Sequence, residues 1–266
     1  DDSAFEDALW HPSWGAISSR AYHAPVGALS ANYGAFFVEV SPSSELGQPT
    51  RVALDPPVDY LKATNRSRTL SEKEGDSLRV GRGLASVDQE DVIISGGLRY
   101  GSSPKLFARS VRDPALYAGS VLKMQLEGLG IPVGGQVRRS QSDRGVVLLV
   151  FKGKPLSEVV ALTLKYSNNA MAETLVKVAG LNASGGQGSW ARGLPILRAQ
   201  LLASGVIGEG AVLADGSGLS TDNRVSARML VKALERSRSS FRVGPEMLAA
   251  LPWAASDGTL ANRLDS

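Results

Sequence analysis

The pattern of apolar and polar positions changes in character about halfway along the 266-residue chain. Before about residue 150, apolar residues come in short runs rich in aromatic and β-branched side chains, a pattern typical of strands. From about residue 152 they recur every three or four positions, which is typical of amphipathic helices. A β-rich first half followed by a helical second half predicts an α+β fold.

The first half contains several segments with strand character. Aromatic and β-branched residues favour strands over 34–42 and 50–57, the second stopped by two prolines, and over 90–102, which ends in a glycine turn. The stretch 133–151 reads as two further strands around the polar turn "SDRG".

One helix is predicted among these strands, over 113–130. Asp113 is placed to cap its N-terminus, Pro114 follows at the first helical position, and Gly130 marks its end. Helical spacing predicts an apolar face and a polar face, made respectively of Leu122, Leu126 and Leu129 and of Ser120, Lys123 and Glu127.

The second half predicts helices over 156–166, 169–180, 190–205 and 226–238. The glycine-rich stretch "ASGGQGSW" joins two of them. The segment "LADGSGLSTDNRVS" (213–226) holds Asp-Gly and Ser-Gly pairs, which mark tight turns with positive φ. This segment is either a plain turn before the last helix or a loop that forms the wall of a cleft.

Composition adds limits on function. The net charge is 29 − 26 = +3, which is small for a nucleic-acid-binding protein, and the short basic clusters at 137–140 and 236–240 lack aromatic neighbours. We interpret both clusters as solvated faces. The longest apolar run, 146–151, has the length of a strand and is far too short to span a membrane.

Cysteine and histidine usage narrows the chemistry further. The chain has no cysteine, and its only histidines, His11 and His23, are not spaced as a metal-binding pair. No G-x-S-x-G turn presents a serine to a histidine base. We therefore expect neither a metal site nor a histidine-based triad.

The strongest candidate chemistry lies in "YSNNAMAETL", at Ser167-Asn168-Asn169. These residues fit S-x-N, one of three short motifs in serine acyl-transfer enzymes that work without histidine. In such enzymes the serine relays a proton to the leaving amine, and the asparagine amide orients a peptide. The motif is short, and "SAN" (30–32) matches it too. The alternative is that Ser and Asn cap the following helix, with Glu173 in its first turn.

A second motif of this kind, S-x-x-K, occurs once, at Ser120–Lys123. The predicted helix places Ser120 two turns inside its N-terminus, where backbone amides are already bonded to carbonyls and cannot hold an oxyanion. We therefore expect a surface serine here, although an enzyme that uses Ser120 and Lys123 stays open as an alternative. The third motif, K-T-G, does not occur.

Together, several segments resemble one protein family. "KYSNNAMAETL", "GSWARG", "DGSGLSTDNRVS" and "LPWAASDGTLANRL" occur in this order, and "APVGALSANYGAFFVEVSP" and "RSVRDPALYAGSVLKMQLEGLGIPVGGQV" agree upstream. The chain is similar over nearly its whole length to the D-alanyl-D-alanine carboxypeptidase/endopeptidase family of low-molecular-weight penicillin-binding proteins (peptidase family S13, DacB-type).

The resemblance implies a domain organisation and a site. In this family a large, mainly β insertion interrupts a transpeptidase-like catalytic domain between its S-x-x-K and S-x-N motifs. Residues 1–151 would be the inserted region and 152–266 the returning part of the catalytic domain. Ser167 and Asn169 would be catalytic, and Asn169 would also bind the substrate peptide.

The chain departs from the family pattern at both ends. The family's nucleophilic serine would lie before Asp1 and its K-T-G after Ser266, and we expect the chain to be part of a longer enzyme. That enzyme would be periplasmic, use no cofactor, cleave peptidoglycan stem peptides ending in D-Ala-D-Ala through an acyl-enzyme, and bind β-lactam antibiotics. The alternative is a non-catalytic cell-wall-binding relative that kept the scaffold.

Overall fold

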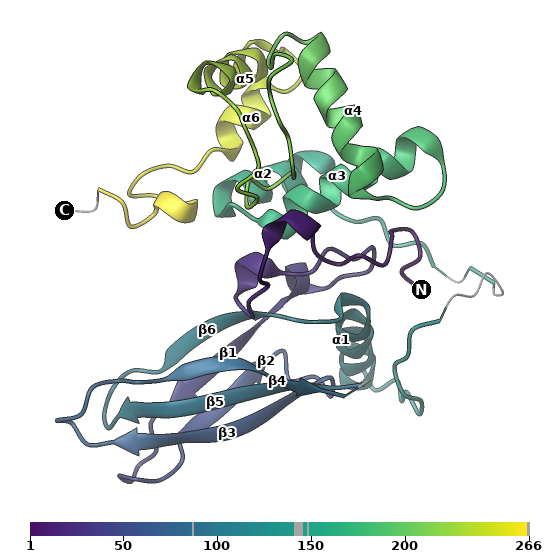
Figure 1. Cartoon of the computed structure of the whole chain (residues 1–266). Coiled ribbons are helices and arrows are strands. Elements are labelled where there is room, and N and C mark those ends of the chain that lie inside the picture. Colours follow the sequence, from purple (N-terminus) through teal and green to yellow (C-terminus); the bar gives the residue numbers. More distant parts are fainter. Residues whose placement is uncertain (87, 141–145, 148, 265–266) are drawn as a thin grey trace. The chain divides into compact units, whose positions relative to one another are not determined.

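The computed structural model describes residues 1–86, 88–140, 146–147 and 149–264. The chain forms two compact units (Figure 1). The β-rich unit comprises Asp1–Asp2 and Ile17–Gln141, and the helical unit comprises Ser3–Ala16 and Ser142–Ser266. All described strands lie in the β-rich unit, which also holds one helix, and the other α-helices lie in the helical unit, so the predicted α+β class is confirmed.

Two three-stranded sheets build the β-rich unit. In the first, β1 (Ala35–Ser41) pairs antiparallel with β2 (Arg51–Asp55) on one side and β6 (Lys105–Ser110) on the other. In the second, the central strand β5 (Glu90–Arg99) pairs parallel with β3 (Leu61–Leu70) and antiparallel with β4 (Arg79–Ala85). Short 3₁₀ turns at Ala21–His23 and Asn32–Gly34 precede β1.

The core of this unit follows from alternation along the strands. In β1, Phe36, Val38 and Val40 are buried, whereas the side chains of Phe37 and Glu39 between them are exposed. Successive strand residues point to opposite faces, so one face is available for packing. This face belongs to one core cluster with buried residues of β5 and of the helix that follows β6. These residues include Val92, Ile94, Leu98, Tyr117 and Val121.

Helix α1 (Pro114–Gly128) begins and ends as predicted. The Asp113 carboxylate accepts hydrogen bonds from the backbone N–H of Ala115 and of Leu116, and Gly130 has φ 79° just beyond the end. The predicted faces were wrong. The buried face carries Leu116, Tyr117, Ser120 and Val121, while Leu122 and Leu129 are exposed. Apolar periodicity alone could not show which of the two stripes the sheets would cover.

The helical unit contains α2 (Leu156–Tyr166), α3 (Asn169–Ser184), α4 (Trp190–Ala203), α5 (Ala227–Ser239) and the short α6 (Gly244–Ala250). The N-terminal segment Ser3–Ala16, with a 3₁₀ turn at Pro12–Trp14, belongs to the same unit and pairs with it through a bridge between Phe5 and Gly188. A last 3₁₀ turn spans Gly258–Leu260.

Two predicted strands are absent from the described part of the chain. The described residues of 133–151 form no strand, and the "SDRG" turn lies outside the described residues. A strand needs a neighbour to bond its backbone, but Val146, Val147, Leu149, Val150 and Phe151 are largely exposed. The two compact units divide after residue 141.

Candidate functional site

Ser167 occupies the turn that joins α2 to α3. Its backbone is left-handed, with φ 51° and ψ 50°, a conformation that costs a residue other than glycine about 1 kcal/mol. The side chain is exposed, and its hydroxyl makes no hydrogen bond to any residue that the structure describes. The chain therefore holds this hydroxyl outward at a strained position, where nothing local requires a serine.

Asn168 performs the capping role that the alternative interpretation gave to this motif. Its side-chain oxygen accepts a hydrogen bond from the backbone N–H of Met171 at 2.9 Å and caps α3. Asn169 is the first residue of that helix and is half-buried. Because Asn168 alone caps the helix, Ser167 and Asn169 are not needed for that purpose.

Glu173, expected in the first turn of α3, is fully buried instead. Its carboxylate accepts hydrogen bonds from the Trp190 indole N–H at 2.7 Å and from the backbone N–H of Gly216 and of Ser217 at 2.8–3.1 Å. A Cβ on Gly216 would lie 2.5 Å from a methyl of Val176, so only glycine fits there. Glu173 thus ties the helix that begins at Asn169 to the "DGSG" loop and to α4.

The "DGSG" loop is organised around a second buried carboxylate, Asp215. It accepts hydrogen bonds from the Trp14 indole N–H and the Asn223 amide, at 2.9 and 2.8 Å, and from the backbone N–H of Gly218 and Ser220. Burial by itself would raise the pKa of Asp215, but these hydrogen bonds outweigh it and lower the pKa below its ordinary value. The ionised Asp215 carboxylate therefore fixes the conformation of the loop.

The predicted turn geometry holds at one of the two glycines. Gly218 has φ 82°, as its Ser-Gly turn predicts, whereas Gly216 has an ordinary φ and is required for its lack of a side chain. Sequence reasoning identified the turn but not the role of Asp215, since Trp14 lies 201 positions away.

Lys177, one turn beyond Glu173, is also fully buried. Its ammonium donates to the carbonyl of Ala8 at 2.6 Å, lies 3.7 Å from the centre of the Trp190 ring and faces Glu6 at 3.6 Å. Burial lowers the pKa of Lys177 to about 8, against the opposing effect of Glu6. This lysine holds the N-terminal segment against the helical unit.

A further segment reaches the C-terminal end of α2. The Lys165 ammonium donates to the carbonyl of Leu251 at 2.7 Å and to the Asp257 carboxylate, and this hydrogen bond holds the pKa of Asp257 below its ordinary value. A Cβ on Gly258 would lie 2.3 Å from the Lys165 carbonyl oxygen. Segments 3–16, 213–226 and 251–264 are thus all fastened to the two helices that meet at Ser167.

The sequence contained one signal for this network. Glu173 and Lys177 fall three and seven positions after the buried Ala170, so they share its helical face with Gly180. Two charged residues on a face otherwise made of small residues indicate a buried polar contact. The partners themselves came from distant segments and could not be inferred.

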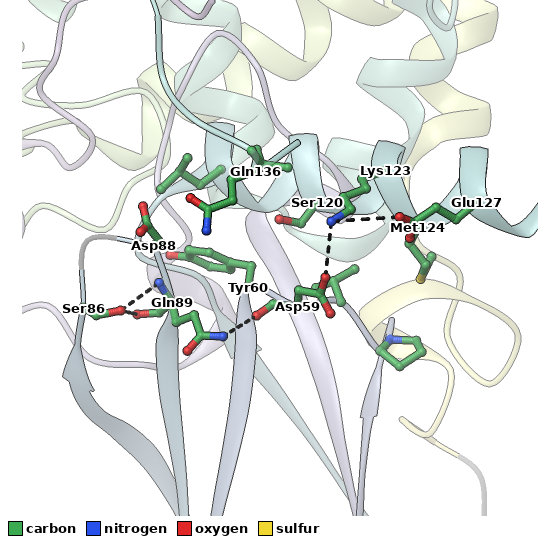
Figure 2. A pocket seen from close by; sticks show the side chains of 14 residues that line it. Asp59, Tyr60, Ser86, Asp88, Gln89, Ser120, Lys123, Met124, Glu127 and Gln136 are labelled. Carbon is green, nitrogen blue, oxygen red and sulfur yellow. Dashed lines mark hydrogen bonds and ion pairs between the residues drawn. The ribbon is translucent and has the colours of Figure 1, made fainter. Parts of the chain in front are cut away.

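The second motif, Ser120–Lys123, lines a cavity of about 570 Å³ in the β-rich unit (Figure 2). Ser120 is 8% exposed, so the expectation of a surface serine was wrong. The Lys123 ammonium lies 3.7 Å from the Asp59 carboxylate and 3.9 Å from the Glu127 carboxylate. Ser120 lies in the middle of α1, whose backbone amides are committed to the helix.

This cavity therefore lacks one requirement of serine acyl transfer, free backbone amide donors beside the serine to hold an oxyanion. Among the described residues, no group of three or more His, Asp or Glu side chains is placed to hold a metal ion. No helix in the described part of the chain is long and apolar enough to cross a membrane.

Comparison with known proteins gives consistent matches. The model of the D-Ala-D-Ala carboxypeptidase 3 (S13) family matches residues 1–266. The chain is 32% identical to a D-alanyl-D-alanine carboxypeptidase of an Actinomadura species, over 99% of this chain and 51% of that protein. It is 28% identical to the D-alanyl-D-alanine carboxypeptidase DacB of Haemophilus influenzae, over 58% of this chain and 32% of that protein.

Solved structures agree on the fold. Penicillin-binding protein 4 (dacB) of Haemophilus influenzae superposes with a TM-score of 0.76 at 21% identity, over 99% of this chain and 58% of that one. The same protein in complex with a β-lactam superposes with a TM-score of 0.68 at 22% identity, over 92% and 55% respectively. The chain spans about half the length of the Actinomadura relative.

Proposed function

Because the chain belongs to the D-Ala-D-Ala carboxypeptidase 3 (S13) family, we propose that it is part of a serine-type D-Ala-D-Ala carboxypeptidase acting on peptidoglycan peptides. The helical unit supplies part of the transpeptidase-like catalytic domain, and the β-rich unit is the region inserted in it. The expected ranges were 1–151 for the inserted region and 152–266 for the catalytic part. Because Ser3–Ala16 belongs to the helical unit, we assign this segment to the catalytic part as well.

In this proposal Ser167 is a catalytic proton relay and Asn169 orients the substrate peptide. The observation that carries the assignment is the outward Ser167 hydroxyl on a left-handed backbone, beside a cap that Asn168 completes alone. A strained residue whose side chain bonds to no described residue fits a functional role better than a structural one. The asparagine amide offers both donors and an acceptor to a peptide.

The reaction requires groups that these 266 residues do not supply. A serine nucleophile outside this chain attacks the penultimate D-Ala carbonyl, D-Ala leaves, and water cleaves the resulting ester. The Ser167 hydroxyl passes a proton toward the leaving amine. β-Lactams acylate the same nucleophile, in line with the β-lactam complex of the structural relative. The enzyme works in the periplasm and needs no cofactor.

Labelling with a fluorescent penicillin, followed by peptide mapping, tests this assignment. We expect the 266-residue protein to take no covalent label, and the longer protein with an S-x-x-K segment upstream to be labelled on that serine. A label on Ser120 would contradict the proposal and make the cavity of Figure 2 the active site. An unlabelled longer protein would favour the non-catalytic cell-wall-binding relative.

A further inference from the structure

The cavity of Figure 2 is built from four segments of the β-rich unit. Its walls are the residues before β3, the loop between β4 and β5, helix α1 and the segment that follows α1. Its volume, about 570 Å³, lies within the range of roughly 300–1,000 Å³ that is typical of small-molecule sites. The backbone around Ser120 does not suit acyl transfer, but the cavity has the size of a binding site.

One polar side chain on α1 lines this cavity without a hydrogen bond. Ser120 is 8% exposed, and its hydroxyl bonds to no residue that the structure describes. Among the described residues no fully enclosed side-chain polar atom lacks a partner, so this hydroxyl is open to the cavity. Buried polar groups in proteins are ordinarily hydrogen-bonded, and a partner for this one has to come from within the cavity.

The Lys123 ammonium is a second group of this kind, one turn further along α1. Its distances to the Asp59 and Glu127 carboxylates, 3.7 and 3.9 Å, are too long for hydrogen bonds, and it bonds to no other described residue. Figure 2 shows Ser120 and Lys123 extending from the helix toward Asp59 and Tyr60. Both groups are therefore placed to bond the same ligand.

The wall opposite α1 is fixed by its own hydrogen bonds. The Gln89 amide donates to the backbone carbonyl of Asp59 at 3.1 Å. The Tyr60 hydroxyl donates to Glu90 at 3.3 Å and accepts from the backbone N–H of Asp113 at 3.1 Å. Since this hydroxyl is already bonded on both sides, Tyr60 contributes its ring to the cavity wall. The cavity thus combines a preformed wall with two unbonded polar groups.

Charge narrows the kind of ligand. Asp59, Asp88 and Glu127 line the cavity together with Lys123, a formal charge of 1 − 3 = −2, which disfavours an anion. No group of three or more His, Asp or Glu side chains in the described residues is placed to hold a metal ion. The Lys123 ammonium already lies between Asp59 and Glu127, where the amine of a cationic ligand would bind. These observations favour a neutral ligand that both accepts and donates hydrogen bonds.

We propose that this cavity binds a neutral N-acetylated sugar of a glycan chain. A sugar hydroxyl accepts one hydrogen bond and donates another, as a site with an ammonium and several carboxylates requires. The planar acetamido group matches the carboxamides of Gln89 and Gln136, and Leu116 and Met124 offer apolar surface to the C–H face of a sugar ring.

The neutral sugar follows from the cavity, whereas the N-acetylated kind rests on the proposed function. The peptides of peptidoglycan are attached to a chain of such sugars. A sugar bound in the β-rich unit would therefore hold the protein on the polymer whose peptides the catalytic part cleaves.

Isothermal titration of the 266-residue protein with tri-N-acetylchitotriose tests the proposal. We expect saturable binding of this neutral sugar, weaker binding of chitotriose, which carries amino groups in place of the acetamido groups, and no binding of the anionic trigalacturonate. Lys123→Met lowers the association constant about tenfold, because a hydrogen bond from a charged donor is lost, and Ser120→Ala lowers it about fivefold. Circular dichroism establishes that each variant is folded.

Matched controls lie in the same unit. Lys62 on β3 and Gln125 on α1 are exposed and do not line the cavity. Lys62→Met and Gln125→Leu leave sugar binding unchanged, whereas Lys123→Met and Gln136→Leu weaken it. Equal losses in the controls would overturn the proposal, because the sugar would then bind outside the cavity.

Three further outcomes would also overturn it. Absence of tri-N-acetylchitotriose binding by the folded protein rejects the sugar directly. Tighter binding of chitotriose would assign the cavity to a cationic ligand. Binding that is lost in the longer protein would mean that another segment covers the cavity. Each of these failures leaves the catalytic assignment standing, because penicillin labelling tests that assignment at a serine outside these 266 residues.

Discussion

The two units each carry a serine in a short acyl-transfer motif, but the backbone around the two serines is opposite in character. Ser120 lies mid-helix on a buried face, beside a lysine that forms ion pairs with two carboxylates. Ser167 lies between two helices, exposed and left-handed, with its neighbour capping the next helix. Spacing alone does not distinguish the two motifs. A motif of this kind therefore has to be assessed together with the backbone conformation of its serine.

Removing each hydroxyl gives the largest contrast. In the longer protein that supplies the nucleophile, Ser167→Ala should slow acylation by penicillin about a hundredfold, since positioned proton transfer contributes roughly 10²–10⁴ in rate. Ser120→Ala should leave the rate unchanged. Stopped-flow measurement of penicillin binding distinguishes the two, and equal effects would remove the contrast between the motifs.

The next largest difference is expected in how much the carboxylates near the two serines contribute to the free energy of unfolding. Glu173→Ala leaves the Trp190 indole N–H and the backbone N–H groups of Gly216 and Ser217 without an acceptor, so it should lower the free energy of unfolding by about 3 kcal/mol. Glu127→Ala should lower the free energy of unfolding by at most about 0.5 kcal/mol, because the ion pair between Glu127 and Lys123 is partly exposed. Urea denaturation measures both changes. Comparable losses would mean that Glu173 holds its surroundings no more firmly than Glu127 does in the β-rich unit.

The buried Lys177 adds a pH dependence. Its pKa, about 8 in the folded protein, lies below the ordinary value of 10.5, so between these values the unfolded chain binds more protons. Stability contributed by this group is complete above about pH 10.5 and is lost as the pH falls through about 8. The wild type should therefore gain up to roughly 3 kcal/mol relative to Lys177→Met over this range. Parallel stability curves for the two proteins would show that Lys177 is not desolvated.

Sequence reasoning succeeded where local signals decide the structure. Helix α2 begins and ends at the predicted residues, and Asp113 caps α1 as expected. It did not predict β3 and β4, because "LKATNRSRTL" and "RVGRGLA" are polar or glycine-containing and become strands only by pairing with β5. Propensity yields to tertiary context in such strands.

The candidate site divides in the same way. Ser167 and Asn169 are proposed from their motif, and their role stays a prediction, whereas the turn at Asp215 was predicted from its glycines. The burial of Glu173, Lys177 and Asp215 depends on Trp190, Gly216 and Trp14, which the fold brings from other segments. A helical pattern predicts that charged residues face the solvent. Only the packed structure shows which of them are buried instead.

Glycine substitution compares the two serine backbones directly, with the smallest expected effect. At Ser167 glycine adopts the left-handed conformation without strain, so Ser167→Gly should raise the free energy of unfolding by about 0.5–1 kcal/mol even as it removes the hydroxyl. At Ser120 glycine sits mid-helix, so Ser120→Gly should lower it by roughly 0.5 kcal/mol. Denaturant titration of both variants, with alanine variants to isolate loss of the hydroxyl, gives the two signs. A Ser167→Gly protein that is both more stable and slower in acylation would mean that the chain retains a strained serine for its chemistry. Destabilisation at both positions would mean that the Ser167 backbone is not left-handed in solution, and would remove the main support for its role as a relay.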